Sequence, residues 1–259
     1  MLLDLELGLS LLASIIPSLV LLHCFYRADN SPVPLPVLRT TFLLAVLIVL
    51  PDYLLGNWHH RLRPEISDPL GAALYVALLV AAVPEEGGKF LVLRLYSARQ
   101  PGFREPMDGV VCGAFAALGF ATVENAQHLG DGALTMTVIR GLTAIPAHAC
   151  FGAIQGYYLG QGWFRGRPRW VTLWGLFVAV LLHALYDFPL LALRNEELHG
   201  GLRAGTPTEL AWRYGLSTLF VLTLAMEGFW TYRIVRRLRQ EQIDRIRSQT
   251  DGSDTASSV

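Results

Sequence analysis

Seven long apolar stretches alternate with short polar connections along this chain. They lie near residues 8–26, 37–56, 69–95, 108–128, 134–160, 170–193 and 210–232. Each stretch is long enough to cross ~30 Å of hydrocarbon as an α-helix. The pattern therefore predicts an all-α fold, namely a polytopic membrane helix bundle of about seven transmembrane helices.

The composition is typical of a membrane protein rather than of a soluble domain. Of the 259 residues, 53 % are hydrophobic and 16 % are charged, and the mean hydropathy is +0.40. The expected surroundings are the lipid bilayer, and a formal net charge of zero argues against a nucleic-acid partner. The three cysteines are scattered through apolar stretches, at no spacing that predicts disulfides or a metal site.

The placement of arginine predicts how the bundle is oriented. Arginines gather in the connections after the first, third and fifth stretches and after the seventh, at positions 27, 39, 94, 99, 104, 165, 167, 169, 233, 236, 237, 239, 245 and 247. The connections on the other side hold Arg61, Arg63, Arg194 and Arg203. Because arginine-rich connections stay in the cytoplasm, the N-terminus is predicted outside and the C-terminus in the cytoplasm.

We expect one transmembrane domain over residues 1–232, followed by a cytoplasmic tail over residues 233–259. The tail first reads RIVRRLRQEQIDRIR, which predicts a helical extension near anionic lipid headgroups. It then reads TDGSDTASSV, a polar composition that is typical of disorder.

The third stretch is interrupted by ionisable residues. Pro84 is followed by Glu85 and Glu86, and Lys89 lies three to four positions further on. Each such group costs roughly 2.5–3.5 kcal/mol at the centre of a membrane helix, so a compensating role is expected. On a helix, Lys89 projects between the two glutamates and can pair with either. The alternative to a functional site is an ion pair that locks two helices together.

The fourth stretch ends in Glu124 and Asn125. Glu124 needs a partner on another helix, either a metal, a histidine or Lys89. Asn125 either orients a substrate backbone or joins two helices by a hydrogen bond. Asp108, near the start of this stretch, is interpreted as a helix N-cap.

Histidines lie in the fifth and sixth stretches. His148 begins a line of small residues at four-residue steps, continued by Gly152, Gly156 and Gly160, which predicts a close helix contact. In the sixth stretch, His183 and Asp187 share one helix face, where the carboxylate can hold the imidazole in one tautomer. Arg140, in the fifth stretch, is either an anchor at the membrane interface or a partner for Glu124.

Together these groups can activate a water molecule, with or without a metal, for attack on a peptide carbonyl. No His-Glu-x-x-His zinc helix and no Gly-x-Ser-x-Gly elbow is present in the sequence. We take as candidate catalytic residues Glu85, Glu86, Lys89, Asn125 and Asp187. The candidate ligands of one divalent metal, with zinc as the expected ion, are Glu124, His148 and His183.

The order of these motifs resembles the PrsW family of bacterial intramembrane proteases, which groups with CAAX prenyl endopeptidases and bacteriocin-processing enzymes. The matching blocks are Glu85-Glu86-x-x-Lys89, then Asp108-Gly109 to Gly119-Phe120-Ala121-Thr122-x-Glu124-Asn125, then Arg140, Pro146, His148 and Gly156 to Gly160, then His183 to Phe188. Four ordered blocks on four stretches make the resemblance specific. A match over Phe25 to Pro32 extends it upstream.

The resemblance implies a multi-pass peptidase of the bacterial inner membrane. The implied substrate is a single-pass, membrane-anchored regulatory protein, typically an anti-sigma factor, and the implied essential residues are the paired glutamates and the histidines. The family is often classed as metallopeptidases. Two other functions suit the same residues: a proton- or ion-coupled transporter, and a non-catalytic scaffold on the protease fold.

Two finer expectations concern geometry. With these helix boundaries and a rise of 1.5 Å per residue, Glu85 and Glu124 lie on the order of 15 Å apart along the membrane normal. Glu86 is favoured as the base, because the angle between Glu85 and Lys89 on a helix makes Glu85 the expected salt-bridge partner.

Overall fold

The computed structural model describes residues 2–62, 66–127, 134–166, 170–199 and 206–256, and in these ranges every regular element is a helix, without a strand. The all-α prediction is therefore confirmed. The elements are α1 (Leu2–Ala28), α2 (Leu35–Leu62), α3 (Pro69–Tyr75), η1 (Val76–Ala82), α4 (Val83–Leu95), η2 (Ser97–Arg99), α5 (Pro106–Gln127), α6 (Leu134–Phe164), α7 (Trp170–His199) and α8 (Pro207–Ala256).

Five of the described helices, α1, α2, α5, α6 and α7, are long and apolar enough to cross a membrane. The other two predicted spans correspond to the continuous α3–η1–α4 segment, which carries the ionisable residues, and to α8. Outward-facing leucines are strongly exposed, for example Leu47 at 67 % and Leu142 at 69 %. Such surfaces are stable when lipid covers them, so the exposed leucines agree with a bundle embedded in a bilayer.

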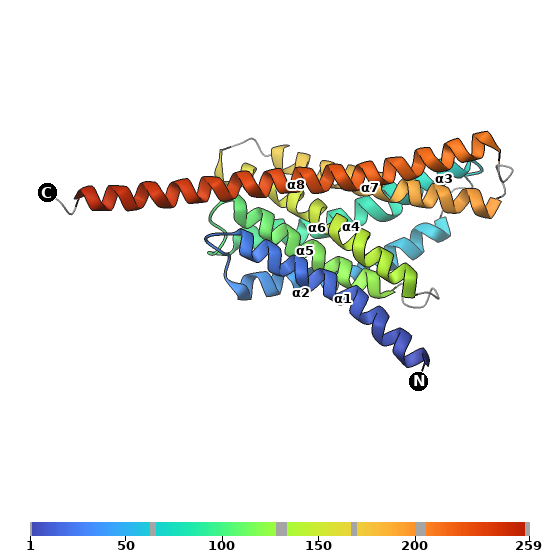
Figure 1. Cartoon of the computed structure of the whole chain (residues 1–259), viewed down its shortest axis with the longest axis horizontal. Helices are drawn as coiled ribbons and strands as arrows, with labels where there is room; N and C mark the ends of the chain where they lie inside the picture. Colours follow the sequence, from blue (N-terminus) through green and yellow to red (C-terminus); the bar gives the residue numbers. More distant parts are fainter. Residues whose placement is uncertain (1, 63–65, 128–133, 167–169, 200–205, 257–259) are drawn as a thin grey trace.

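The centre of the bundle is formed by α5 and α6, which pack against each other along their length (Figure 1). Helices α1 and α2 lie on one side of this pair, and α7 with α8 on the other. Residues Pro106 to Ala121 of α5 are buried without interruption, although α5 is one of the membrane-crossing helices. Asp108, the charged residue of this stretch, therefore faces protein and not lipid.

The predicted close helix contact lies between α5 and α6. A Cβ atom on Gly156 would stand 1.9 Å from the carbonyl oxygen of Gly109, and one on Gly152 would stand 2.2 Å from that of Gly113. Only glycine allows the two backbones to approach this closely. The contact fixes the position of His148, one turn before Gly152, relative to α5.

The third helical segment changes its winding just before the ionisable residues. Val76–Ala82 forms π-helix η1, and α4 begins directly after it with Pro84 in its first turn. Proline has no N–H to donate to the preceding turn, and a π-helical stretch accommodates the lost hydrogen bond while keeping the helix continuous. Glu85, Glu86 and Lys89 follow at once, so this local winding sets the direction in which they point.

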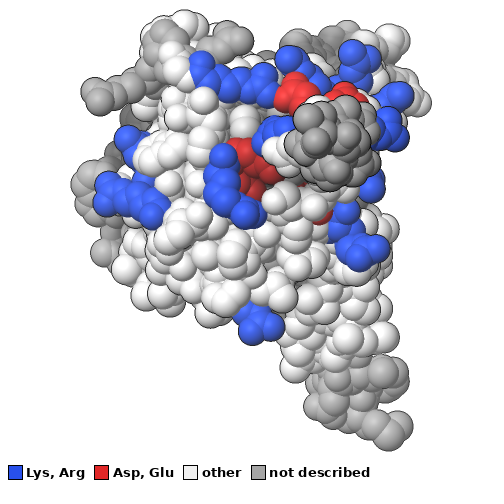
Figure 2. All heavy atoms as spheres, turned by 90° about the vertical axis from the view of Figure 1, so that its left-hand side faces the viewer, with Lys and Arg blue, Asp and Glu red and all other residues white. Residues whose placement is uncertain are grey.

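The connections predicted to share one side of the membrane do meet at one end of the bundle. Arg104 donates to the carbonyl oxygen of Ser31 at 3.1 Å, and Arg165 pairs with Glu241. We call this end, with residues 29–34, 96–105 and α8 from Arg233 onward, the arginine-rich end. Figure 2 looks onto it and shows acidic side chains set among many Lys and Arg. Of the predicted arginines, Arg63, Arg167, Arg169 and Arg203 lie outside the described residues.

Helix α8 passes the predicted domain boundary at residue 232 without a break and projects beyond the bundle (Figure 1). It continues to Ala256, which includes part of the segment whose composition predicted disorder. The division into a domain and a tail stays a prediction. The N-cap interpretation of Asp108 is wrong in detail, because α5 begins at Pro106 and Asp108 accepts from the backbone N–H groups of the two residues before that proline.

Candidate functional site

Glu85, Glu86 and Lys89 of α4 are buried and contact one another. The Lys89 ammonium lies 2.7 Å from Oε1 of Glu86 and 3.3 Å from Oε2 of Glu85. Lys89 and Glu86 are fully buried, and the Glu85 side chain is 8 % exposed. As predicted, Lys89 stands between the two carboxylates and pairs with both.

Lys89 also reaches α5 and α6. Its ammonium lies 2.9 Å from Nδ1 of His148 and 4.2 Å from the centre of the Phe120 ring. A lysine in hydrocarbon is stable only when carboxylates and polarisable groups surround it. The first of these contacts places His148 beside the paired glutamates.

Glu124 is bound from two sides. Nε2 of His148 lies 3.0 Å from its Oε2, and the Arg140 guanidinium lies 2.5 Å from its Oε1. Of the two alternatives for Arg140, the structure supports the ion pair with Glu124. The contact between Glu124 and Nε2 holds the His148 ring so that Nδ1 points towards Lys89. Outer contacts of this kind orient functional histidines.

The predicted pair on α7 is present. Nε2 of His183 lies 3.2 Å from Oδ2 of Asp187, and Nδ1 lies 3.0 Å from Oε1 of Glu86. Phe151 of α6 stacks on the imidazole, with 5.2 Å between the ring centres. The His183 ring is therefore held on both edges and on one face.

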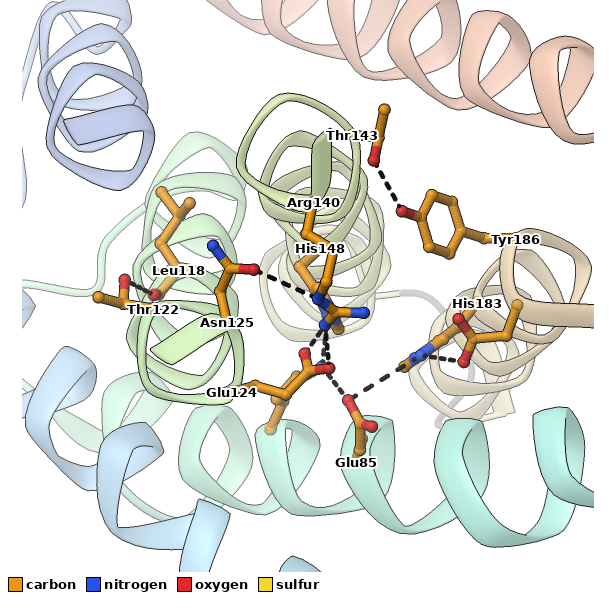
Figure 3. A network of polar contacts seen from close by, with 12 residues as sticks. Glu85, Leu118, Thr122, Glu124, Asn125, Arg140, Thr143, His148, His183 and Tyr186 are labelled. Carbon is orange, nitrogen blue, oxygen red and sulfur yellow. Dashed lines mark hydrogen bonds and ion pairs between the residues drawn. The ribbon is translucent and has the colours of Figure 1, made fainter. Parts of the chain in front are cut away.

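These contacts bring four possible ligand atoms together. One atom each from Glu85, Glu86, His148 and His183 lies within 4.8 Å of the others. Figure 3 shows the side chains of Glu85, Glu124, His148 and His183 converging from α4, α5, α6 and α7. We call Glu85, Glu86, His148 and His183, together with Lys89, the intramembrane cluster. It differs from the predicted metal ligands by the two glutamates, which converge with the histidines, whereas Glu124 contacts His148 from the far side.

Two geometric expectations are wrong. Glu124 and Glu85 do not lie far apart along the membrane, because Lys89 and His148 bridge them by direct contacts. The helices are offset along their axes, so that the middle of the third segment lies level with the end of α5 (Figure 1). The closer partner of Lys89 is Glu86 and not Glu85, which removes the reason for favouring Glu86 as the base.

Asn125 joins helices in this structure. Its side chain donates to Oγ of Ser14 at 3.2 Å and accepts from Nε of Arg140 at 3.2 Å. These bonds connect α1, α5 and α6 next to the Glu124 ion pair. Of the two alternatives left open for Asn125, the structure supports the hydrogen bond between helices.

Two acids near the cluster, half-buried Asp52 and buried Glu227, were not among the predicted residues. Asp52 of α2 lies close enough to interact electrostatically with Lys89 and Glu124, and Glu227 of α8 interacts with His183. No hydrogen-bond partner among the described residues reaches Oδ1 of Asp52 or either carboxylate oxygen of Glu227. A signal for Glu227 exists in the sequence, because Thr223 and Thr231 flank it at four-residue steps and share its buried face.

Comparison with known proteins bears on the same residues. Residues 33–225 match a family described as PrsW family intramembrane metalloprotease. Protease PrsW of Bacillus subtilis is 37 % identical over 193 residues, which is 71 % of this chain and 83 % of that protein. Protease PrsW of Geobacillus kaustophilus is 33 % identical over 194 residues, which is 73 % of this chain and 83 % of that protein. No solved structure matches this chain.

Proposed function

Because this chain belongs to the PrsW family of intramembrane metalloproteases, we propose that its intramembrane cluster hydrolyses a peptide bond of a single-pass membrane protein. The single observation that carries the proposal is the convergence of two glutamates and two histidines, within 4.8 Å, inside a membrane helix bundle. Ionisable residues are rare in such bundles because burying them is costly. Peptide hydrolysis needs the acid–base groups that they supply.

We assign the water-activating role to Glu85. Its contact with Lys89 is the longer of the two, and its side chain is the less buried of the paired glutamates. A carboxylate that is less tightly ion-paired retains an oxygen for a water proton. Glu86, held by Lys89 and His183, serves to position these two partners.

We assign the proton transfer to the leaving amine to Glu85 as well, and the positioning of that carboxyl group to His183. Asp187 and Glu86 fix the orientation of its ring, and the Nε2 edge also lies 3.9 Å from Oε2 of Glu85. After it has taken the proton from water, the Glu85 carboxyl group gives this proton to the departing nitrogen as the C–N bond breaks. Lys89 supplies positive charge close to the oxyanion that forms when the carbonyl is attacked.

The donor atoms fit a zinc ion. Two imidazole nitrogens and carboxylate oxygens are ligands that Zn²⁺ accepts, and Oε2 of Glu86 is buried without a hydrogen-bond partner in the part of the chain that the structure describes. His148, His183 and Glu86 would hold the ion, which leaves Glu85 for the attacking water. When bound, it would polarise the substrate carbonyl or the attacking water as a Lewis acid.

The substrate class and the location complete the proposal. The chain is a multi-pass membrane protein, and its relatives are bacterial, so we place it in the bacterial inner membrane. A regulatory protein of the anti-sigma-factor type, with one membrane span, fits a site buried between helices. Such a substrate presents its peptide bond at membrane depth.

Reconstitution in liposomes tests the proposal. The wild-type chain is combined with a reporter that carries the single membrane span and flanking residues of a host anti-sigma factor, and the products are sized by mass spectrometry. We expect a cut near the membrane that Glu85→Gln abolishes. Ion flux without any cut would support the transporter, and full cleavage by Glu85→Gln would remove the assigned base.

The metal is tested separately by elemental analysis of the purified protein. We expect close to one zinc per chain, and its loss in His148→Ala and in His183→Ala. An enzyme that stays fully active after its metal has been removed by a chelator contradicts the metal assignment. The role of Glu85 is decided separately, by the cleavage assay with Glu85→Gln.

A further inference from the structure

A second group of buried acids lies at the arginine-rich end, outside the intramembrane cluster. Asp29 directly follows α1, Glu105 precedes α5, and Asp108 lies in the first turn of α5. One carboxylate oxygen of each residue lies within 4.8 Å of the other two. We call these three residues the acidic cluster.

Hydrogen bonds satisfy only part of the acidic cluster. Nε2 of Gln242, on α8, donates to Oδ1 of Asp29 at 2.7 Å and to Oε1 of Glu105 at 2.8 Å. Oδ2 of Asp108 accepts from the backbone N–H groups of Arg104 and Glu105. The remaining oxygens, Oδ2 of Asp29 and Oδ1 of Asp108, are buried and have no hydrogen-bond partner among the residues that the structure describes.

Positive charge from the chain reaches the acidic cluster only at its rim. In the described residues, the one ion pair is between Arg245 and Oε2 of Glu105, at 2.9 Å. The Arg104 guanidinium donates to Ser31, and from there its charge also acts on Asp29. Asp29 and Asp108 are 5 % and 0 % exposed, so water does not reach their unpaired oxygens freely. Buried carboxylate oxygens without partners are rare, because they lose hydration without compensation.

We propose that Asp29, Glu105 and Asp108 together bind one hard divalent cation, Ca²⁺ or Mg²⁺. The donors are all oxygens, with no imidazole or thiolate among them, which is the ligand type that these cations select. The unpaired oxygens of Asp29 and Asp108 are the ones left for the ion. The proposal does not depend on the protease assignment, because the acidic cluster shares no residue with the intramembrane cluster.

A proton is the competing partner. Burial raises the pKa of the Asp29 carboxyl and outweighs the opposing hydrogen bond from Gln242, while the nearby charge of Glu105 raises it further. The unpaired oxygens of Asp29 and Asp108 still lack a positive partner among the described residues. Either a cation or a proton is that partner, and the two differ in whether a titration with metal gives saturable binding.

The bound cation would tie three distant segments together. Asp29 belongs to the connection between α1 and α2, while Glu105 and Asp108 belong to the start of α5. Gln242 attaches the projecting part of α8 to the same point, and its Oε1 also accepts from the backbone N–H of Asn30 at 3.1 Å. We therefore expect the cation to stabilise the arginine-rich end without changing the chemistry of the intramembrane cluster.

Isothermal titration calorimetry of the full-length chain in detergent tests the proposal. The protein is first treated with a chelator and then titrated with Ca²⁺ alone and with Mg²⁺ alone. We expect one saturable site per wild-type chain for at least one of the two ions. Asp29→Asn and Glu105→Gln, each of which removes one ligand charge, are expected to weaken the binding roughly tenfold or more. Size-exclusion chromatography and circular dichroism confirm that each variant is folded.

Two control variants make the result specific. Asp244→Asn removes an exposed carboxylate from the same helix, next to Gln242, and should bind like the wild type. Glu85→Gln alters the intramembrane cluster and should also leave this binding unchanged. Absence of saturable binding by the wild type, or equal binding by all variants, overturns the proposal and leaves the proton as the partner. If one ligand variant does not fold, the wild type and the other variant still decide.

Discussion

The intramembrane cluster and the acidic cluster are both built from buried carboxylates on separate segments, yet they gain positive charge in different ways. In the first, Lys89 contacts both glutamates of α4, and Arg140 pairs with Glu124. In the second, the chain offers Arg245 at the rim and leaves two buried oxygens unpaired. An uncompensated carboxylate is costly in hydrocarbon, so the cluster inside the membrane is paired with cationic side chains of the chain itself. A cluster at the arginine-rich end can take a cation from solution.

The glycine contact between α5 and α6 connects the two clusters. At one end of it, Gly109 follows Asp108 of the acidic cluster and faces Gly156. At the other end, Gly113 faces Gly152, one turn from His148 of the intramembrane cluster. The two clusters therefore share one rigid support but differ in what they hold. Variants of the intramembrane cluster, of the glycine contact and of the acidic cluster separate the contributions of the three.

The largest effect is expected from Glu85→Gln. Loss of the water-activating carboxylate should lower the cleavage rate by about 10²–10⁴-fold, because general-base catalysis contributes on that order. The thermal unfolding midpoint should change little, since glutamine keeps the size of the side chain and Glu86 keeps its contact with Lys89. The rate is measured with the liposome assay and the midpoint by circular dichroism. A variant that cleaves at the wild-type rate contradicts the assignment, and Asp244→Asn is the matched control.

A smaller but still large effect is expected from Gly156→Val. The added Cβ would lie 1.9 Å from the carbonyl oxygen of Gly109, so α5 and α6 must separate. Overpacking of this kind typically lowers the free energy of unfolding by about 1–3 kcal/mol and occasionally by more. Because both clusters rest on this contact, cleavage and cation binding should decline together. Chemical denaturation and the two functional assays measure the three quantities on the same preparation.

Gly87→Ala is the matched control for the glycine contact. Gly87 lies on α4 between the paired glutamates and Lys89, but a Cβ there meets no atom within 4 Å. Alanine in a helix is favoured over glycine by about 1 kcal/mol, so the variant should be as stable as the wild type or slightly more stable. Equal destabilisation by both variants would mean that the helix approach does not depend on Gly156.

The sequence predicted the intramembrane cluster better than it predicted the contacts within it. Spacing on single helices was enough to pair Lys89 with two glutamates and His183 with Asp187, since these pairs depend only on helix periodicity. The preferred partner of Lys89 depends on His148, which comes from another helix, and periodicity carries no information about that. The offset of the helices along the membrane likewise depends on tertiary packing, which made the expected separation of Glu85 and Glu124 wrong.

The acidic cluster shows a different limit of the sequence. Asp29 follows α1, Glu105 precedes α5, and Asp108 lies in the first turn of α5. Each residue by itself therefore resembles a helix cap or a residue of a solvated connection. Gln242 lies in a segment whose charge predicted only contact with lipid headgroups. Nothing in the spacing of these residues indicates that α8 returns to the first connection, which is a long-range packing outcome. Only the fold brings them within 4.8 Å.

A moderate effect, confined to the acidic cluster, is expected from Gln242→Ala. The variant removes the hydrogen bonds to Asp29 and Glu105, and the backbone N–H of Asn30 loses its acceptor on Gln242. A hydrogen bond to a charged group contributes at most about 1.5–3 kcal/mol. We therefore expect the free energy of unfolding of the variant to fall by about 1–3 kcal/mol. Cleavage should stay at the wild-type level. Gln240→Ala, which removes an exposed bond to Asp244 on the same helix, should change neither quantity.

The smallest effect is expected in the pH dependence of stability. The pKa of Asp29 is raised above its ordinary value of 3.8, chiefly by burial, so the folded chain holds a proton that the unfolded chain has released. The free energy of unfolding should therefore fall as the pH rises from about 4 through the folded-state pKa, by the linkage of proton binding to folding. The charged and polar groups that face Asp29 are Arg104, Glu105, Asp108, Gln242 and Arg245.

Asp29→Asn removes this titration and should flatten the decline, measured by chemical denaturation at a series of pH values in the presence of a chelator. Saturating Ca²⁺ or Mg²⁺ should flatten it in the wild type as well, because a bound cation stabilises the ionised carboxylate and displaces the proton. The intramembrane cluster contributes equally to both proteins and cancels in the difference between them. If the cation leaves the wild-type slope unchanged while Asp29→Asn removes it, a proton alone neutralises the acidic cluster. The contrast with the intramembrane cluster would then lie in protonation and not in a bound ion.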